Sequence, residues 1–138
     1  MVAATEAISQ GRQARNDGSF AAARAYYAEA AKIYRDQNEV LAYAHTIRHI
    51  ADIYQQESNL LEAKPLYEEA LDLYRRNLGT RILDLANTVR PYALLNEEQG
   101  DLELARKLWE EARQLYGSLR VASGVSECDV HISKLQQT

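Results

Sequence analysis

Three segments of the chain superpose without gaps: GSFAAARAYYAEAAKIY (18–34), SNLLEAKPLYEEALDLY (58–74) and GDLELARKLWEEARQLY (100–116). They begin at Gly18, Ser58 and Gly100, so the repeat offset is 40 and then 42. Their apolar columns recur at three- and four-residue steps, which is the period of an α-helix with one buried face. Self-similarity at this spacing predicts an array of repeated helical units.

The aligned columns give the expected core of each repeat. Alanine and aromatic residues alternate in these columns: Ala23, Ala63 and Ala105; Tyr27, Tyr67 and Trp109; Ala30, Ala70 and Ala112; Tyr34, Tyr74 and Tyr116. One residue before each apolar run stands a favoured N-cap type, namely Ser19, Asn59 or Asp101. Each run is therefore predicted to be a helix with a marked start.

A further helix is predicted before each of these runs. LAYAHTIRHIADIYQQ (41–56) aligns with LDLANTVRPYALLNEE (83–98), and the segment at 1–16 aligns more loosely. Gly11, Ala51 and Ala93 share a column of small residues, which lets two helices cross closely. The repeating unit is thus a helix–turn–helix. A last segment, GVSECDVHISKL (124–135), aligns as a first helix with no second helix, and we expect it to cap the array.

We therefore predict one all-α domain over residues 1–138, an α-solenoid of three hairpins and a C-terminal capping helix. The expected repeats are 1–36, 39–77 and 81–118, followed by the capping helix at 123–136. Six glycines and two prolines are too few for the many turns of a β-sandwich or barrel, which agrees with this prediction.

Charge and composition exclude several classes of partner. The net charge of −4 opposes nonspecific binding to nucleic acid or to an anionic membrane. No apolar run approaches the roughly 18 residues that a membrane span needs. A single cysteine excludes an internal disulfide, and the segment at 1–16 lacks the apolar core of a signal peptide. We expect a mature protein in the cytoplasm.

The repeats resemble the tetratricopeptide repeat (TPR) family, whose signature is Trp-x2-Leu-Gly-x2-Tyr followed by Ala-x3-Phe. Here the first part reads Ile47-x2-Ile50-Ala51-x2-Tyr54, and the second reads Ala63-x3-Tyr67. The long period set by the two offsets and the segment EAKPLYEEAL (62–71) resemble the kinesin-light-chain style of repeat. The paired asparagines of that style are replaced by Arg48-His49 and Arg90-Pro91.

The resemblance implies a concave groove, lined by the first helix of each repeat, that binds peptides or partner helices. It also implies a scaffold or adaptor that binds proteins and is not an enzyme. Helical phase gives the candidate groove residues: Arg12, Arg15, His45, Arg48, His49, Asp52, Asn87 and Arg90.

Two of these arginines suggest what the groove binds. Arg48 and Arg90 occupy one column of adjacent repeats, so we expect them side by side, about 8–10 Å apart. Their guanidinium groups would then match the oxygens of a carboxylate, which favours an acidic or carboxylate-bearing peptide. The alternative is that they pair within the protein, with Asp52 and Glu97.

Two other functions are kept as alternatives. His45, His49 and Asp52 lie on one helical face, and two histidines with one carboxylate can form an open metal site. However, ligands on a single helix rarely close a site, and HTIRH (45–49) lacks the glutamate of a metalloprotease helix. The third alternative is a structural homo-oligomer that associates through the ends of the array.

Signals for enzymatic chemistry are weak, and we predict neither an enzyme nor a cofactor. The chain has no glycine-rich phosphate loop and no G-x-S-x-G motif. Cys128 lies one helical turn before His131, but it shares a column with two threonines and is expected to pack. Most tyrosines are assigned to the core, whereas Tyr43 and Tyr92 are left open between core and groove. The glutamates of the second helices are expected to be solvated: Glu68, Glu69, Glu110 and Glu111.

Overall fold

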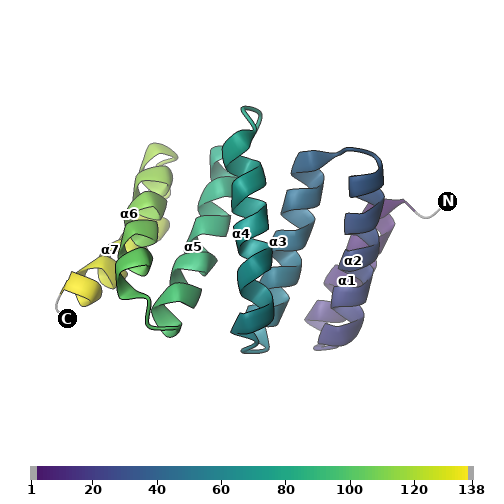
Figure 1. Cartoon of the computed structure of the whole chain (residues 1–138), viewed down its shortest axis with the longest axis horizontal. Helices are drawn as coiled ribbons and strands as arrows, with labels where there is room; N and C mark the ends of the chain where they lie inside the picture. Colours follow the sequence, from purple (N-terminus) through teal and green to yellow (C-terminus); the bar gives the residue numbers. More distant parts are fainter. Residues whose placement is uncertain (1–2, 137–138) are drawn as a thin grey trace. The chain divides into compact units, whose positions relative to one another are not determined.

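The structure is a computed structural model that describes residues 3–136, so the first two and last two positions of the predicted domain lie outside it. The described residues form seven helices and no strand (Figure 1). These helices are α1 (Ala4–Asn16), α2 (Phe20–Asp36), α3 (Val40–Gln56), α4 (Leu60–Arg76), α5 (Ile82–Glu98), α6 (Leu102–Ser118) and α7 (Ala122–Gln136). The predicted all-α helical repeat fold is confirmed.

Five of the six connections between helices have the same geometry. In each of them, the second residue after the helix adopts a left-handed conformation: Gly18, Asn38, Ser58, Gly100 and Arg120. The connection from α4 to α5 differs, because Asn77 after α4 is extended, with φ −107° and ψ 119°. From α2 onward each helix begins 20 residues after the previous one, except that α5 begins 22 residues after α4. The connection from α4 to α5 is therefore two residues longer than the others. The longer connection explains why the second repeat offset is 42 and not 40.

Two of the three predicted N-caps form side-chain hydrogen bonds. Asn59 Oδ1 accepts from the amide of Glu62, and Asp101 Oδ1 accepts from the amide of Leu104, each at 3.3 Å. Ser19 stands at the same position before α2 but makes no such bond. The two capped helices also carry an acidic residue in the first turn, where its negative charge interacts favourably with the positive end of the helix dipole.

Contacts between helices divide the chain into unit 1 (Met1–Asn77) and unit 2 (Leu78–Thr138). In unit 1, α1 packs on α2, α2 on α3 and α3 on α4, so the four helices follow one another in chain order (Figure 1). In unit 2, α5 packs on α6, and α6 packs on α7. The boundaries predicted for one domain of three repeats stay a prediction.

The core of each unit is formed by the columns of alanine and aromatic residues. Tyr27, Tyr67 and Trp109 are at most 2% exposed, and the column alanines one helical turn before and after each of them are fully buried. A Cβ added to Gly11 would lie 3.0 Å from the Tyr27 ring, which explains the small residue at this position of α1. The exposed fraction therefore confirms the first three predicted columns, whereas in the fourth Tyr74 and Tyr116 are buried and Tyr34 is half-buried.

Helix α7 has the surface of a cap. Only Cys128 and Leu135 of its described residues are buried. The repeat alignment places Asp129 and Ser133 in the columns of the buried Ile47 and Ala51, yet both are exposed. Within residues 3–136 no second helix follows α7, and its exposed side chains are polar or charged apart from Ala122 and Val130. This polar surface agrees with the predicted capping role.

Candidate functional site

Six of the predicted groove residues come together in unit 1. We call them the first-helix face of unit 1: Arg12, Arg15, His45, Arg48, His49 and Asp52. The first two lie on α1 and the others lie on α3, one or two helical turns apart, so each helix presents them on one side. Arg12 is exposed, whereas the other five side chains are half-buried. The face is therefore partly desolvated, which strengthens its electrostatic interactions.

Asp52 is held by the fold from two directions. Arg48 Nη1 donates to Asp52 Oδ2 at 2.8 Å, as the alternative interpretation of the sequence predicted. The Tyr67 hydroxyl of α4 lies 2.6 Å from Asp52 Oδ1 and 2.8 Å from Gln55 Oε1. Burial and the charge of Asp52 raise the pKa of Tyr67, so its hydroxyl remains a donor. Both oxygens of Asp52 are therefore bound within the protein, and its negative charge is largely neutralised by Arg48.

His49 occupies a cationic and partly dry environment. Its ring stacks on Tyr27 with centroids 5.5 Å apart, and the ring of His45 contacts it edge-on at 4.6 Å. Burial lowers the pKa of His49 to about 3, and four basic neighbours contribute to this shift: Arg48, His45, Arg15 and Arg12. His49 is thus neutral at pH 7, although the charge around it is positive.

Three buried nitrogen atoms of α3 lack a hydrogen-bond partner among the described residues. They are Arg48 Nε, His49 Nδ1 and Gln55 Nε2. The arginine and glutamine atoms are N–H donors in every protonation state that the protein adopts near neutral pH. A buried donor without a partner costs about 1–3 kcal/mol. The face is therefore suited to a ligand group that supplies acceptor oxygens.

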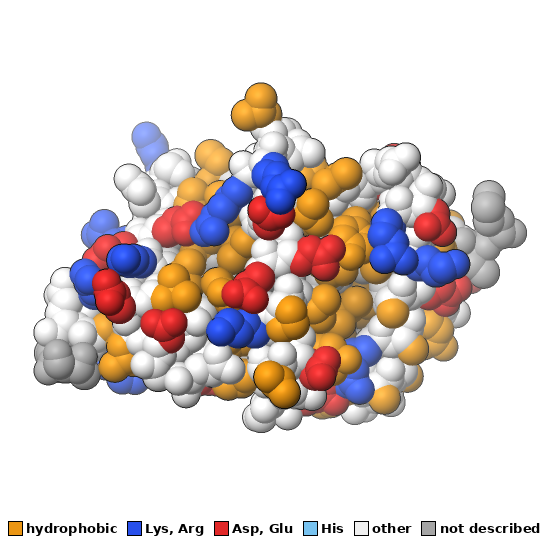
Figure 2. Space-filling model, viewed as in Figure 1, with side chains coloured by type: hydrophobic (Ala, Val, Ile, Leu, Met, Phe, Trp, Pro, Cys, Tyr) orange, Lys and Arg blue, Asp and Glu red, His pale blue; other side chains and the backbone are white. Residues whose placement is uncertain are grey.

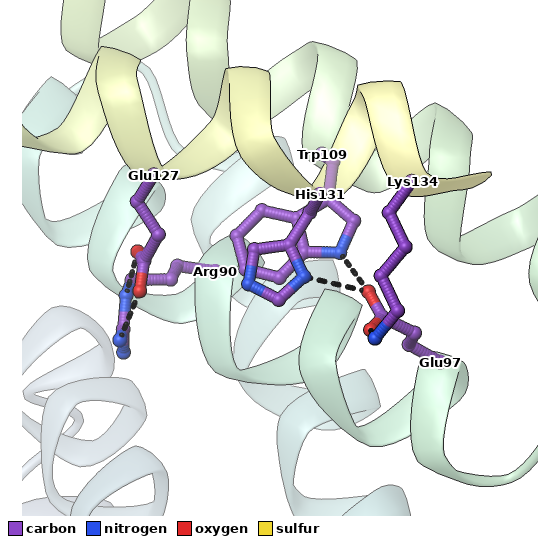
Figure 3. Close-up of polar contacts among 6 residues, drawn as sticks. All are labelled: Arg90, Glu97, Trp109, Glu127, His131 and Lys134. Atoms are coloured by element: carbon purple, nitrogen blue, oxygen red, sulfur yellow. Dashed lines mark hydrogen bonds and ion pairs between the residues drawn. The ribbon is translucent and has the colours of Figure 1, made fainter. Parts of the chain in front are cut away.

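The two predicted groove residues of unit 2 already have partners within that unit. Asn87 Oδ1 accepts a hydrogen bond from the Tyr116 hydroxyl at 2.7 Å. Arg90 pairs with Glu127 of α7 through two hydrogen bonds of 2.5 and 2.8 Å (Figure 3). These bonds hold the pKa of Glu127 below its usual range. The alternative interpretation of the sequence named Glu97 as a partner of Arg90, whereas the carboxylate that the structure places on Arg90 is Glu127 of α7.

Glu97 instead connects three helices of unit 2. Its Oε1 accepts from Trp109 Nε1 at 3.0 Å and lies 2.8 Å from His131 Nδ1, while Lys134 reaches its Oε2 at 3.4 Å. His131 stacks on Trp109 with centroids 4.0 Å apart, as Figure 3 shows. Burial opposes ionisation of Glu97, but the hydrogen bonds from these partners outweigh it and lower its pKa.

The sequence analysis did not predict that Glu97, Trp109, His131 and Lys134 form a cluster. The sequence placed His131 one helical turn after Cys128 and in the column of His49, and it placed Trp109 in a core column. Cys128 is fully buried, and burial together with its acidic neighbours raises its pKa to about 11. The thiol is therefore neutral at pH 7 and packs in the core, as its column predicted. Glu127 and Lys134 carried no signal, because only the docking of α7 gives them partners.

The structure assigns a packed position or an internal partner to each tyrosine left open between core and groove. Tyr92 is buried, and Tyr43 directs its hydroxyl to Glu69 of α4. Neither residue therefore extends the first-helix face.

The alternative of a metal site receives no support from the geometry. No group of three histidine, cysteine, aspartate or glutamate residues within residues 3–136 is arranged to hold a metal ion. His45 and His49 contact each other edge to face, and Asp52 is bound to Arg48 and Tyr67.

None of the described helices is long and apolar enough to cross a membrane.

Comparisons with known proteins agree with the repeat analysis. The family model described as "Tetratricopeptide repeat" matches residues 40–118. Among solved structures, the chain is similar to BtubC (BKLC) from P. vanneervenii, with a TM-score of 0.84 and 18% sequence identity. That match covers 97% of this chain but 55% of the BtubC chain, so this chain spans about half the length of that protein.

A search of curated proteins finds no significant match. At 18% identity the likeness to BtubC shows a shared fold. The family match covers more than half of the chain, and it includes both motif-bearing hairpins, α3–α4 and α5–α6. The resemblance predicted from the repeats is therefore confirmed, and the chain belongs to the tetratricopeptide repeat family.

Proposed function

We propose that this protein is a non-enzymatic scaffold or adaptor module that binds an acidic segment of a partner protein on its first helices. The observation that carries this proposal is the first-helix face of unit 1. Buried N–H donors without partners lie there beside Arg12 and Arg15, near His49, whose pKa is lowered first by burial and then by its basic neighbours. Carboxylates supply acceptor oxygens and negative charge together, so they match both features.

The arginines of the predicted clamp keep a place in this proposal, with different roles. The Nε of Arg48 is buried without a hydrogen-bond partner while its Nη1 donates to Asp52, so we expect Nε to donate to the ligand. Arg90 is already paired with Glu127, so a ligand carboxylate would have to replace that residue. We therefore expect Arg12, Arg15 and Arg48, all in unit 1, to supply the attraction, whereas Asn87 and Arg90 of unit 2 are held by partners within that unit.

The test is a peptide-display selection against three proteins. The first is the wild type, the second is Arg12→Gln/Arg15→Gln, and the third is Arg76→Gln as the control. Arg76 is exposed on α4 and pairs with Asp72, so its loss changes the charge outside the first-helix face. Circular dichroism of all three proteins checks that the helices are retained.

The proposal expects the wild type and Arg76→Gln to enrich peptides rich in aspartate and glutamate, or peptides with a free carboxyl end. Arg12→Gln/Arg15→Gln should lose this enrichment, and in the wild type it should weaken at higher salt because exposed charges are screened. Enrichment of neutral or basic peptides, or equal enrichment by all three proteins, would show that the ligand is not acidic or lies elsewhere.

A further inference from the structure

A pocket lies in unit 1, away from the first-helix face. It has a volume of about 260 Å³ and is formed by α2, α3, α4 and the turn between α2 and α3. Figure 2 shows hydrophobic side chains gathered between α2 and α4, with charged side chains of both signs beside them. The pocket is lined by Arg35, Asn38, Glu39, Val40, Tyr43, Glu69 and Leu73. Tyr43 lies about 200° around α3 from His45, so the two sites use different sides of this helix.

One wall of the pocket is apolar and remains accessible. Val40 is 42% exposed although it is a large hydrophobic residue, and Leu73 and Tyr43 are half-buried. An aliphatic chain of four or five atoms fits a cavity of this size and would cover these surfaces. The pocket therefore suits an elongated side chain better than a flat surface contact.

The polar groups of the pocket carry an excess of negative charge. Glu39 and Glu69 are carboxylates, and Arg35 is the single basic residue of the lining. Tyr43 donates to Glu69 Oε2 at 2.8 Å, which leaves Oε1 available to accept from a ligand. Burial and the neighbouring Glu69 raise the pKa of Tyr43, so the tyrosine keeps this proton. Two carboxylates against one guanidinium favour a cationic occupant, and the net charge of −4 attracts it at longer range.

We propose that this pocket binds an arginine side chain of a partner protein, with its aliphatic stem on Val40 and Leu73 and its guanidinium at Glu39 and Glu69. The planar donors of a guanidinium can reach two carboxylates at once, which a single ammonium does less well. The site is separate from the acidic-peptide site under Proposed function, and it takes a ligand of opposite charge.

Unit 2 offers a comparison for this site. The repeat offset of 42 pairs Glu39 with Arg81, Tyr43 with Leu85 and Glu69 with Glu111. In unit 2 the basic Arg81 therefore replaces the carboxylate of Glu39, and Leu85 replaces Tyr43, whose hydroxyl orients Glu69. We expect these positions of unit 2 not to respond to an arginine ligand.

The test uses two small probes, N-acetyl-arginine amide and N-acetyl-citrulline amide, which have nearly the same shape but differ in charge. Amide chemical shifts of the ¹⁵N-labelled full chain are followed during titration. The arginine probe should move the signals of Val40, Tyr43 and Leu73 and should bind about fivefold more tightly than the citrulline probe, because two partly exposed ion pairs contribute modestly. The signals of Ile82 and Leu85 should stay in place.

Two variants locate the effect. Glu39→Gln/Glu69→Gln should remove the preference for arginine over citrulline, whereas Glu29→Gln should keep it. Glu29 is an exposed residue in the α2 column that corresponds to Glu69, so this variant removes one carboxylate outside the pocket. Val40→Ser should weaken both probes equally, since it shortens the apolar wall and leaves the charge unchanged.

Three results would overturn the proposal: no shift at the pocket residues of the wild type, equal binding of the two probes, or an arginine preference that survives Glu39→Gln/Glu69→Gln. Arg12→Gln/Arg15→Gln should bind the arginine probe like the wild type. The outcome here is therefore independent of the acidic-peptide selection, and either proposal can fail alone.

Discussion

Unit 1 and unit 2 place a histidine in the same column and stack it on the same kind of partner, yet the two histidines have opposite surroundings. His49 stacks on Tyr27, and His131 stacks on Trp109. Arginines surround His49, and its Nδ1 has no partner among the described residues, whereas the Nδ1 of His131 lies 2.8 Å from Glu97. A repeated backbone thus fixes where a ring lies, while the neighbouring side chains decide its electrostatics.

The two units also differ in whether the polar groups on their first helices have hydrogen-bond partners. In unit 2, α7 supplies the carboxylate that pairs with Arg90 and the imidazole that contacts Glu97. In unit 1, the corresponding donors of α3 keep unpaired atoms. Because a buried donor is stabilised by any acceptor that reaches it, unit 1 is the stronger candidate for binding.

The largest effect should come from removing the aromatic partner in each unit. Trp109→Ala should lower the free energy of unfolding by about 3–5 kcal/mol, because it leaves a large cavity and unstacks His131. Tyr27→Ala should cost less, since Trp109 is the larger side chain and also donates to Glu97. Guanidinium unfolding followed by circular dichroism measures both variants. A greater loss for Tyr27→Ala would contradict this ranking.

The pH dependence of stability should distinguish the two histidines. The pKa of folded His49 is about 3, below its unfolded value near 6.5, so the unfolded chain binds a proton that the folded chain does not. Stability from the neutral ring is therefore present above about pH 6.5 and falls as the pH drops toward 3, by about 2 kcal/mol at pH 5.

His49→Phe keeps a ring on Tyr27 and should remove most of this loss between pH 7 and pH 5. His131→Phe is the matched control, because it keeps a ring on Trp109 and leaves the titration of His49 in place. Chemical unfolding at several pH values gives the comparison. An unchanged pH profile in His49→Phe would mean that His49 does not carry the effect.

Two glycines that pack on tyrosine rings offer a smaller comparison. A Cβ at Gly124 of α7 would lie 2.6 Å from Cγ of Tyr116, at the rigid base of the ring. A Cβ at Gly11 of α1 would lie 3.0 Å from the edge of the Tyr27 ring, which can give way more easily. Gly124→Ala should therefore destabilise by about 1–2 kcal/mol despite the better helix propensity of alanine. Gly11→Ala should be nearly neutral. Thermal unfolding of both variants checks this order, and a larger loss for Gly11→Ala would contradict it.

The smallest effect concerns equivalent turns of the two units. Ser58 after α3 has φ 62°, whereas Gly100 occupies the same position after α5 with φ 84°. A serine in the left-handed region is strained and a glycine is not, so Ser58→Gly should stabilise by about 0.5–1 kcal/mol. Gly100→Ser should destabilise by a similar amount. Equal melting temperatures for Ser58→Gly and the wild type would show that the turn is not strained.

Much of the fold was predictable from sequence because its determinants are local or periodic. The three- and four-residue spacing of Ala23, Tyr27 and Ala30 indicates a buried helical face without reference to any distant contact. Repetition of the same columns then predicts how consecutive helices pack. The Arg48–Asp52 pair was predictable for the same reason, since residues four apart on a helix are neighbours.

The partners across helices were not predictable in this way. Arg90 and Glu127 are far apart in sequence, and their contact depends on the angle at which α7 docks. Glu69 is exposed, as expected for the glutamates of the second helices, but its contact with the Tyr43 hydroxyl of α3 was not predicted. A side chain of four or five bonds can reach several neighbours, so the identity of its partner depends on packing that no sequence pattern encodes.

The sequence by itself determined an all-α repeat, its columns of core residues and its family, because hydrophobic period and residue size act through adjacent turns of a helix. Only the tertiary structure decided which charges are satisfied. It paired Arg90 with α7, gathered His131 and Trp109 around Glu97, and left Arg48 and His49 with unpaired nitrogens. The physical reason is that burial follows from local pattern, whereas electrostatic environment is the sum of all groups that folding brings within a few ångströms.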